Sequence, residues 1–197
     1  MRLKVMSIII LIAVLAGGST AHAFRFGIGG FAGANMPIGQ EDARMGPAFG
    51  IKVRIPLVPF VGIEPHFIYL KNGQSEIEIK HDYWNDTPQK TDGGKYTTFG
   101  VNLVFGSITG NAGLNFYGVF GVSAATFNKH DGAIPNLSRA SYWTGLGVEY
   151  GINDAFTVDF HAKFLFFPYK GDSKTVSRKN GIVTIGVNYY IGEGDEL

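Results

Sequence analysis

The stretch FTVDFHAKFLFF, residues 156–167, decides the fold, because its side chains alternate between two chemically different sets. Every second residue is apolar, starting with the first phenylalanine, and Thr157, Asp159, His161 and Lys163 lie between these apolar residues. Successive side chains of a β-strand point to opposite faces. The alternation therefore predicts a strand with one apolar face and one face that carries charge.

The same period of two recurs along the chain and predicts eight strands. They are expected at residues 24–35, 46–55, 60–70, 95–106, 115–127, 140–152, 156–167 and 181–191. Aromatic residues occur at both parities of the fifth strand, which leaves a β-bulge open there. The connections alternate between short turns, such as 56–59, and long loops, such as 71–94 and 168–180. This layout is typical of an all-β, eight-stranded antiparallel up-and-down transmembrane β-barrel.

The first 23 residues have the layout of a secretory signal peptide. Two basic residues in MRLK precede an apolar run over residues 5–16, and the small-x-small triplet Ala21-His22-Ala23 follows. The run is shorter than the roughly 20 residues that a membrane helix needs. We therefore expect cleavage after Ala23 and a barrel domain over residues 24–197, with strands to about residue 191 and a short polar tail.

Composition narrows the partners and the chemistry of the chain. Seventeen basic and sixteen acidic residues give no electrostatic footprint for nucleic acid. The sequence has no cysteine, and hence no disulfide, no cysteine-based metal site and no lipid-attachment cysteine. We expect no cofactor and no enzymatic activity.

Glycine indicates which face of the strands lies inside the barrel. Eight glycines share the charged face: Gly27, Gly29, Gly50, Gly62, Gly100, Gly145, Gly147 and Gly186. A glycine within a strand costs about 0.5–1 kcal/mol, which a water-facing surface explains poorly, whereas a narrow lumen needs small residues beside long ionic ones. We therefore expect the apolar face to contact lipid. A soluble, lipocalin-like carrier with the faces reversed is the alternative.

The predicted lumen holds ionic groups of both signs and two histidines. These residues are Arg25, Lys52, Arg54, Glu64, His66, Glu149, Asp159, His161 and Lys163. Buried charges require partners, so we expect a structural network that fills the barrel, with Lys52 opposite Glu64 if the short turn sets the register. A conducting pore, and a metal site formed by His66, His161 and a carboxylate, are the alternatives.

Aromatic residues are expected to form two belts at the two membrane interfaces. The belt near the short turns is predicted to contain Phe24, Phe26, Phe105, Tyr150, Phe156, Tyr189 and Tyr190. The belt near the long loops is predicted to contain Tyr69, Tyr96, Tyr142, Phe166 and Tyr169.

The long loops contain two candidate sites. Residues 75–80 alternate polar and apolar, so the third strand is expected to continue as a raised hairpin. Tyr83 and Trp84 beyond it are candidate contacts to an extracellular ligand, because aromatic residues often anchor interfaces. His130 and Ser138 would form a lipid-hydrolase pair only within hydrogen-bond reach of each other. Ordinary solvated loops are the alternative in both places.

The segments GLGVEYGINDAFTVDFHAKF, residues 145–164, and GIVTIGVNYYI, residues 181–191, resemble the closing strands of small bacterial outer-membrane β-barrel proteins. This group holds the opacity-type, OmpX-like and OmpA membrane-domain barrels. The resemblance implies outer-membrane lipid, lipopolysaccharide and the barrel-assembly machinery as partners. It also implies a structural or surface-interaction role, in adhesion or membrane integrity, with a narrow solute channel as the alternative. Unlike many such proteins, the chain does not end on an aromatic residue, because IGEGDEL follows Tyr190.

Overall fold

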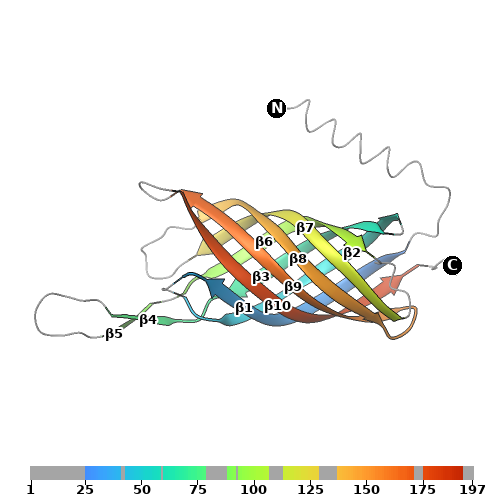
Figure 1. Ribbon diagram of the computed structural model, residues 1–197, viewed down its shortest axis with the longest axis horizontal. Helices are drawn as coiled ribbons and strands as arrows, with labels where there is room; N and C mark the ends of the chain where they lie inside the picture. Colours follow the sequence, from blue (N-terminus) through green and yellow to red (C-terminus); the bar gives the residue numbers. More distant parts are fainter. Residues whose placement is uncertain are drawn as a thin grey trace, which may run out of the picture.

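The chain forms a closed antiparallel barrel of eight strands (Figure 1). The computed structural model describes residues 25–40, 43–58, 60–78, 88–91, 93–106, 113–128, 137–170 and 175–192. The barrel strands are β1 (Phe26–Ile38), β2 (Gly46–Val58), β3 (Val61–Lys71), β6 (Lys95–Gly106), β7 (Gly113–Asn128), β8 (Leu137–Gly151), β9 (Phe156–Lys170) and β10 (Thr175–Ile191). Each strand pairs with the barrel strand before it, and β1 closes the barrel on β10. The predicted up-and-down topology is confirmed.

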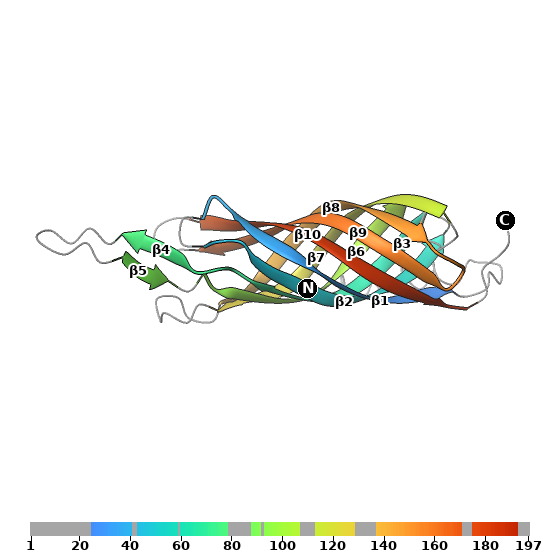
Figure 2. The same cartoon turned by 90° about the horizontal axis from the view of Figure 1, so that it is seen from below.

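A short two-stranded hairpin projects from one end of the barrel, between β3 and β6 (Figures 1 and 2). Its strands, β4 (Ser75–Glu78) and β5 (Pro88–Thr91), pair antiparallel and form a sheet of their own. The raised hairpin that the sequence predicts is therefore present. We name this end of the barrel the loop end, and the opposite end, where β2 leads into β3 and β8 into β9, the turn end.

Several strands extend further toward the loop end than the apolar pattern predicts. β9 and β10 stay paired as far as Lys170 and Thr175, so the long loop predicted over residues 168–180 is wrong. Backbone hydrogen bonds hold an antiparallel pair whatever its side chains are. The pairing consequently continues after the apolar alternation has ended.

The turn between β2 and β3 also lies later in the chain than predicted. β2 continues through Pro56 to Val58, and its register with β3 shifts between these two residues as at a β-bulge. Lys52 consequently pairs with His66, and the predicted pairing with Glu64 is wrong. Because the register differs by two residues, the same side chains still face the lumen.

β7 is regular, and the bulge that its sequence left open is absent from this strand. Its register with both neighbours runs without a shift from end to end. Phe116 and Phe120 are exposed on the outside, whereas Tyr117 and Phe127 are buried inside. Aromatic residues therefore occur at both parities because this strand presents them both to the outside and to the lumen.

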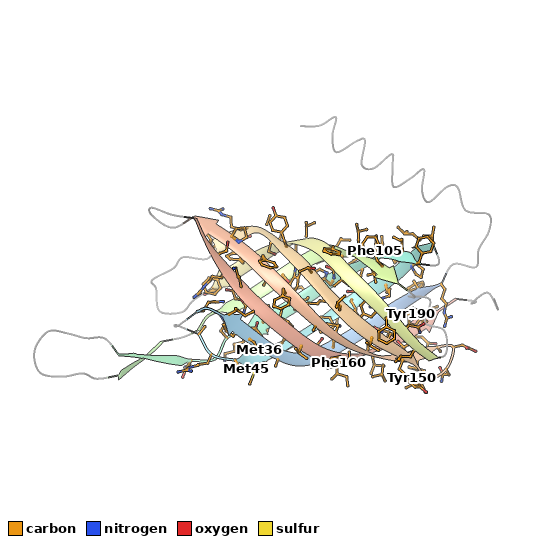
Figure 3. The ribbon with its side chains drawn as sticks, viewed as in Figure 1. Met36, Met45, Phe105, Tyr150, Phe160 and Tyr190 are labelled. Atoms are coloured by element: carbon orange, nitrogen blue, oxygen red, sulfur yellow. The ribbon has the colours of Figure 1, made fainter. Side chains whose placement is uncertain are left out.

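The apolar face of the strands lies outside the barrel (Figure 3). Phe160 and Phe164 are 53% and 46% exposed, whereas Asp159 and Lys163 on the same strand are 0% and 1% exposed. A soluble carrier would bury these phenylalanines and expose the charges. The predicted sidedness is therefore confirmed, and the lipocalin-like alternative is wrong.

The aromatic belts are present with two corrections. Exposed aromatic residues near the two ends of the wall include Phe105, Tyr150, Phe156 and Tyr189 at the turn end and Tyr142 and Phe166 toward the loop end. Tyr96 and Tyr190 instead point into the lumen, where they are 0% and 3% exposed, because they have the inner parity of their strands. Phe24 and the side chain of Tyr169 lie outside the described residues.

The described part of the chain contains no helix that combines the length and hydrophobicity of a membrane span. The predicted signal peptide and its cleavage after Ala23 lie outside the described residues and stay a prediction.

Candidate functional site

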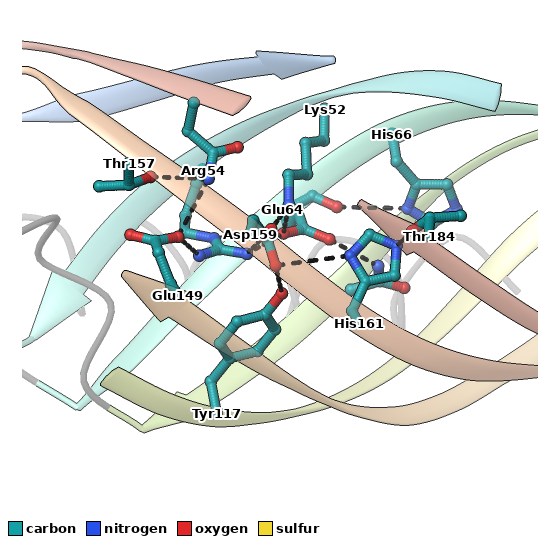
Figure 4. A network of polar contacts seen from close by, with 12 residues as sticks. Lys52, Arg54, Glu64, His66, Tyr117, Glu149, Thr157, Asp159, His161 and Thr184 are labelled. Atoms are coloured by element: carbon teal, nitrogen blue, oxygen red, sulfur yellow. Dashed lines mark hydrogen bonds and ion pairs between the residues drawn. The ribbon is translucent and has the colours of Figure 1, made fainter. Parts of the chain in front are cut away.

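Three cations and three carboxylates lie together in the half of the lumen near the turn end (Figure 4). Four strands supply them: Lys52 and Arg54 from β2, Glu64 from β3, Glu149 from β8, and Asp159 and Lys163 from β9. None of the six residues is more than 2% exposed. We name this set the charge network. Its formal charge is zero, which is what a lumen closed to water requires.

Arg54 lies at the centre of the charge network and contacts all three carboxylates. Its Nε and Nη2 donate to Glu64 Oε2 at 3.2 and 2.7 Å. Nη1 donates to Glu149, and Nη2 lies 3.5 Å from Asp159 Oδ2. The guanidinium also stacks on the ring of Tyr117, 4.4 Å from its centroid. Only arginine offers five donors in a rigid plane, so one side chain on β2 holds the three strands β3, β8 and β9.

The two lysines complete the pairing. Lys52 forms an ion pair with Asp159 and lies 3.8 Å from Glu64 Oε2. Lys163 Nζ donates to Glu64 Oε1 at 3.1 Å. Both ammonium groups also lie under 6 Å from the ring centroid of Phe31, at 5.9 and 5.8 Å. The ring thus caps the network on the side that faces the loop end.

Neutral donors occupy the remaining positions around the carboxylates. They are Tyr117 to Asp159 Oδ1 at 2.5 Å, Tyr190 to Glu149 Oε1 at 2.9 Å, Asn188 to Glu149 Oε2 at 3.0 Å, and Asn102 to Glu64 Oε1 at 3.1 Å. Each carboxylate therefore accepts from a neutral group as well as from cations. Charges held in this way are costly to remove one at a time.

The two histidines flank the charge network and contact different groups. His161 Nε2 lies 2.5 Å from Thr184 Oγ1, and its Nδ1 lies 3.6 Å from Asp159 Oδ1. His66 Nδ1 lies 3.3 Å from the backbone oxygen of Glu64. Among the described residues, no three histidine or carboxylate side chains are placed to hold a metal ion.

Glycines on the inner face leave room for these large side chains. A Cβ added to Gly147 would lie 2.2 Å from Cζ of Tyr117, the residue opposite it on β7. A Cβ added to Gly50 would lie 2.7 Å from Cζ of Phe31. Glycine is therefore needed at these inner positions to make room for large side chains, as predicted.

The half of the lumen near the loop end is apolar. Its buried cluster, which we name the apolar layer, consists of Phe31, Ala48, Ile68, Leu70, Tyr96, Ala125, Phe127, Trp143, Leu165, Phe167 and Ile182. The indole of Trp143 donates to Ser123 Oγ at 2.7 Å, and Ser123 Oγ lies 2.6 Å from Ser141 Oγ. These two serines satisfy the one polar group that the indole brings into the layer.

Three buried asparagines lie at the loop end and tie β1 and β10 to the base of the hairpin. Asn35 Nδ2 donates to Asn72 Oδ1 at 2.6 Å, and Asn180 Nδ2 donates to Asn35 Oδ1 at 2.7 Å. Asn72 Nδ2 donates in turn to the backbone oxygen of Gly93 at 2.8 Å. We name this group the asparagine clasp. It fixes the point at which the β4–β5 hairpin leaves the barrel.

The structure brings together eight of the nine predicted lumen residues. Arg25 differs, because it is only half-buried and its guanidinium lies 5.1 Å from the ring centroid of Tyr190, near the turn end. Tyr83, Trp84 and His130 lie outside the described residues.

Of the predicted hydrolase pair, the structure describes only Ser138, and the contacts of Ser138 do not support the prediction. Ser138 is exposed, and its Oγ accepts from Thr126 Oγ1 at 3.2 Å. No described histidine contacts it, so the described residues supply no base to activate this serine.

Sequence reasoning missed the apolar layer and the asparagine clasp. The signal for the first was present in the opening stretch, because Leu165 and Phe167 continue the inner parity of Asp159 and Lys163. The clasp had no local signal, since its three residues are far apart in the chain.

No protein-family model and no curated protein matches the sequence. Solved structures do share the barrel. The N-terminal β-barrel domain of Pseudomonas aeruginosa OprF has a TM-score of 0.54 and 12% identity, over 85% of this chain and 97% of that domain. Neisserial surface protein A has a TM-score of 0.55 and 13% identity, over 85% and 96%. The Pseudomonas aeruginosa outer membrane protein OprG has a TM-score of 0.57 and 14% identity, over 85% and 96%.

These identities are low, so the likeness concerns the fold. The match nevertheless extends over most of this chain and nearly the whole of each of the three structures. Together with the closed strand order and the apolar outer face, they confirm the architecture that the sequence predicts. The chain is an eight-stranded transmembrane β-barrel with the fold of the small bacterial outer-membrane barrel proteins.

Proposed function

We propose that this protein is a non-enzymatic component of the outer membrane whose filled barrel holds surface loops out toward an external partner. The observation that carries the proposal is the packing of the lumen. The charge network is at most 2% exposed, and the apolar layer closes the other half. An eight-stranded barrel has room for little beyond its own side chains. The barrel therefore serves as a rigid support, and the loops carry the interaction.

Placement in the outer membrane is supported by the outer face. Exposed phenylalanine, leucine, isoleucine and valine cover the wall between the aromatic belts. A closed barrel also leaves no unpaired strand edge in hydrocarbon. The turn end would face the periplasm and the loop end the exterior. Export by the predicted signal peptide, insertion by the barrel-assembly machinery, and contact with lipopolysaccharide belong to this proposal.

The hairpin is the part of the molecule best placed to meet an external partner. β4 and β5 stand clear of the barrel in both views (Figures 1 and 2). The asparagine clasp fixes the base of the hairpin, and Arg44 and Gly73 exchange backbone hydrogen bonds of 3.1 and 2.8 Å beside it. Because the base of the hairpin is fixed, less conformational entropy is lost when a partner binds the hairpin. Tyr83 and Trp84, between the two strands, are the proposed contacts.

The test replaces residues 75–92 with a short Gly-Ser linker, which keeps Asn72 and Gly93 of the clasp. Cells that express the parent or the variant are compared for adhesion to surfaces coated with extracellular-matrix proteins. We expect the variant to insert and fold but to lose adhesion. A Tyr83→Ser/Trp84→Ser variant, which keeps the hairpin, is the matched control for the aromatic contacts. Equal adhesion by parent and hairpin variant would contradict the proposal.

A solute conduit is the competing role, and it has its own test. Purified barrel is added to planar bilayers under an applied voltage. We expect no conductance steps, because ions would have to pass both the charge network and the apolar layer. Steps that vanish after a bulky substitution in the lumen would favour the conduit instead.

A further inference from the structure

An apolar groove of ≈ 560 Å³ crosses the outer wall of the barrel from β6 to β9. Its lining residues are Val101, Leu103, Phe120, Gly121, Val122, Tyr142, Trp143, Thr144 and Phe166. Gly121 has no side chain and Thr144 has a short one, and larger aliphatic and aromatic groups surround both. The groove is thus a depression in the outer surface of the barrel, where small residues lie between larger apolar side chains.

The strand registers show where the groove leads. Val101 pairs with Val122, and Val122 pairs with Tyr142. Tyr142 pairs with Phe166, and Phe166 pairs with Lys179 of β10. Side chains that are directly paired across neighbouring strands lie about 4.5–5.5 Å apart at Cβ. One continuous row of outward side chains therefore runs along the groove and reaches Lys179 on β10.

Lys179 is the one charged residue in this row. It is exposed, and no ion pair joins its ammonium group to another residue that the structure describes. It lies four residues from the loop-end limit of β10, where the wall meets the interface. An ammonium at this depth is within reach of lipid phosphates, and it would be costly in the hydrocarbon itself.

Among the side chains that the structure describes, the exposed ionic ones toward the loop end are basic. The exposed ionic side chains toward the loop end are Arg44, Lys71, Lys95, Arg139 and Lys179. Among described side chains, the carboxylates are those of the buried charge network and of Asp154, which lies in the turn between β8 and β9. These described basic side chains favour an anion beside them, and the groove favours a hydrocarbon chain.

We propose that the groove and Lys179 form a binding site for one phosphate-bearing membrane lipid. One acyl chain would lie in the groove against Val122 and Phe166, and the lipid phosphate would pair with the Lys179 ammonium. A chain that lies in a hollow contacts more protein atoms than a chain on a convex wall, so it gains more dispersion contacts. The inference rests on the proposed membrane location and adds to it a defined lipid site.

Trp143 lies in the apolar layer and is only 2% exposed, so a lipid in the groove does not reach its indole. The reporter protein is therefore the Trp84→Phe/Tyr142→Trp variant, because Tyr142 lines the groove and is exposed on the outer face. This variant is the parent for the comparisons below. The protein is reconstituted in phosphatidylcholine vesicles that contain a small fraction of chain-brominated lipid, either phosphatidylglycerol or phosphatidylcholine. Bromine quenches tryptophan on contact, so quenching measures how often a brominated chain occupies the groove.

We expect the brominated anionic lipid to occupy the site about five-fold more strongly than the neutral one, which is the effect of the roughly 1 kcal/mol that one basic side chain supplies at a lipid surface. Lys179→Gln should bring the ratio to about one. Thr144→Phe, which fills the groove with an outward ring, should lower the quenching by both lipids. Lys71→Gln removes an equally exposed lysine outside the groove and should leave the ratio unchanged.

Equal quenching by the two lipids in the parent, or an unchanged ratio in Lys179→Gln, would overturn the site while leaving the barrel in the membrane. If Lys71→Gln lowered the ratio as much as Lys179→Gln does, the preference would come from general surface charge, and the proposed site would also be overturned. No quenching by either lipid would contradict the membrane location itself.

Discussion

The two halves of the lumen are filled by opposite means. Near the turn end, six buried charges and four neutral donors hold one another through ion pairs and hydrogen bonds. Near the loop end, apolar side chains fill most of the lumen, and its polar contacts include neutral hydrogen bonds, such as those of Trp143 with Ser123 and of the asparagine clasp. The charge network depends on every member, because each charge is costly without its partner. The apolar layer tolerates the loss of a member at the cost of a cavity. One half of the lumen is therefore sensitive to the loss of any single side chain, and the other half is less sensitive.

The largest effect is expected when the charge network loses its centre. Arg54→Met would leave Glu64, Glu149 and Asp159 with two cations between them in a site closed to water. We expect the free energy of unfolding to fall by about 4 kcal/mol, as when one partner of a buried ion pair is removed. Urea unfolding in lipid vesicles, followed by fluorescence, measures the change.

Arg54→Lys is the matched control for charge, and it should recover part of the loss because an ammonium cannot bridge three carboxylates. Arg139→Met removes an exposed arginine and should have little effect. A fall below about 1 kcal/mol for Arg54→Met would show that water reaches the network, since solvent would then replace the lost contacts.

The apolar layer should respond less, and through volume. Leu165→Ala removes a fully buried side chain and should cost about 3 kcal/mol, within the range for buried leucines. Leu146→Ala is the matched control, because Leu146 is exposed on the lipid face, where acyl chains can fill the space. Equal losses in the two variants would contradict the distinction between a closed interior and a fluid exterior.

A smaller effect is expected at the glycines that make room for the charge network. The Cβ of Gly147→Ala would lie 2.2 Å from the Tyr117 ring, so the ring must move and its bond to Asp159 must weaken. We expect a loss of about 1–3 kcal/mol, as in other overpacked interiors. Gly118→Ala is the control, since its Cβ would meet Leu146 at an ordinary 3.7 Å. Unfolding midpoints that match in the two variants would contradict this account.

The sequence was sufficient for the wall of the barrel, because the two sides of the wall meet different surroundings along its whole length. That difference imposes a period of two, and a period of two is visible in one strand at a time. Phe160 and Asp159 were therefore placed on the correct sides without any knowledge of the neighbouring strands.

The contents of the lumen were less predictable, because they depend on strands that are not neighbours. Parity placed Lys52 and Asp159 inside, but only the closed barrel brings β2 and β9 face to face. Tyr190 was assigned to a membrane belt by its residue type, and its inner parity overrode that preference. A two-residue difference in the β2–β3 register was enough to change the partner of Lys52 from Glu64 to His66.

The smallest expected effect tests whether the two halves act independently. Arg54→Met combined with Glu64→Gln should lose less stability than the two changes summed, with a coupling energy of about 1–3 kcal/mol, because each removes the other's orphaned charge. Arg54→Met combined with Leu165→Ala should be additive within about 0.5 kcal/mol, since the two side chains share no partner in the structure. Coupling of the second pair as strong as that of the first would mean that Phe31, which touches both halves, transmits strain between them.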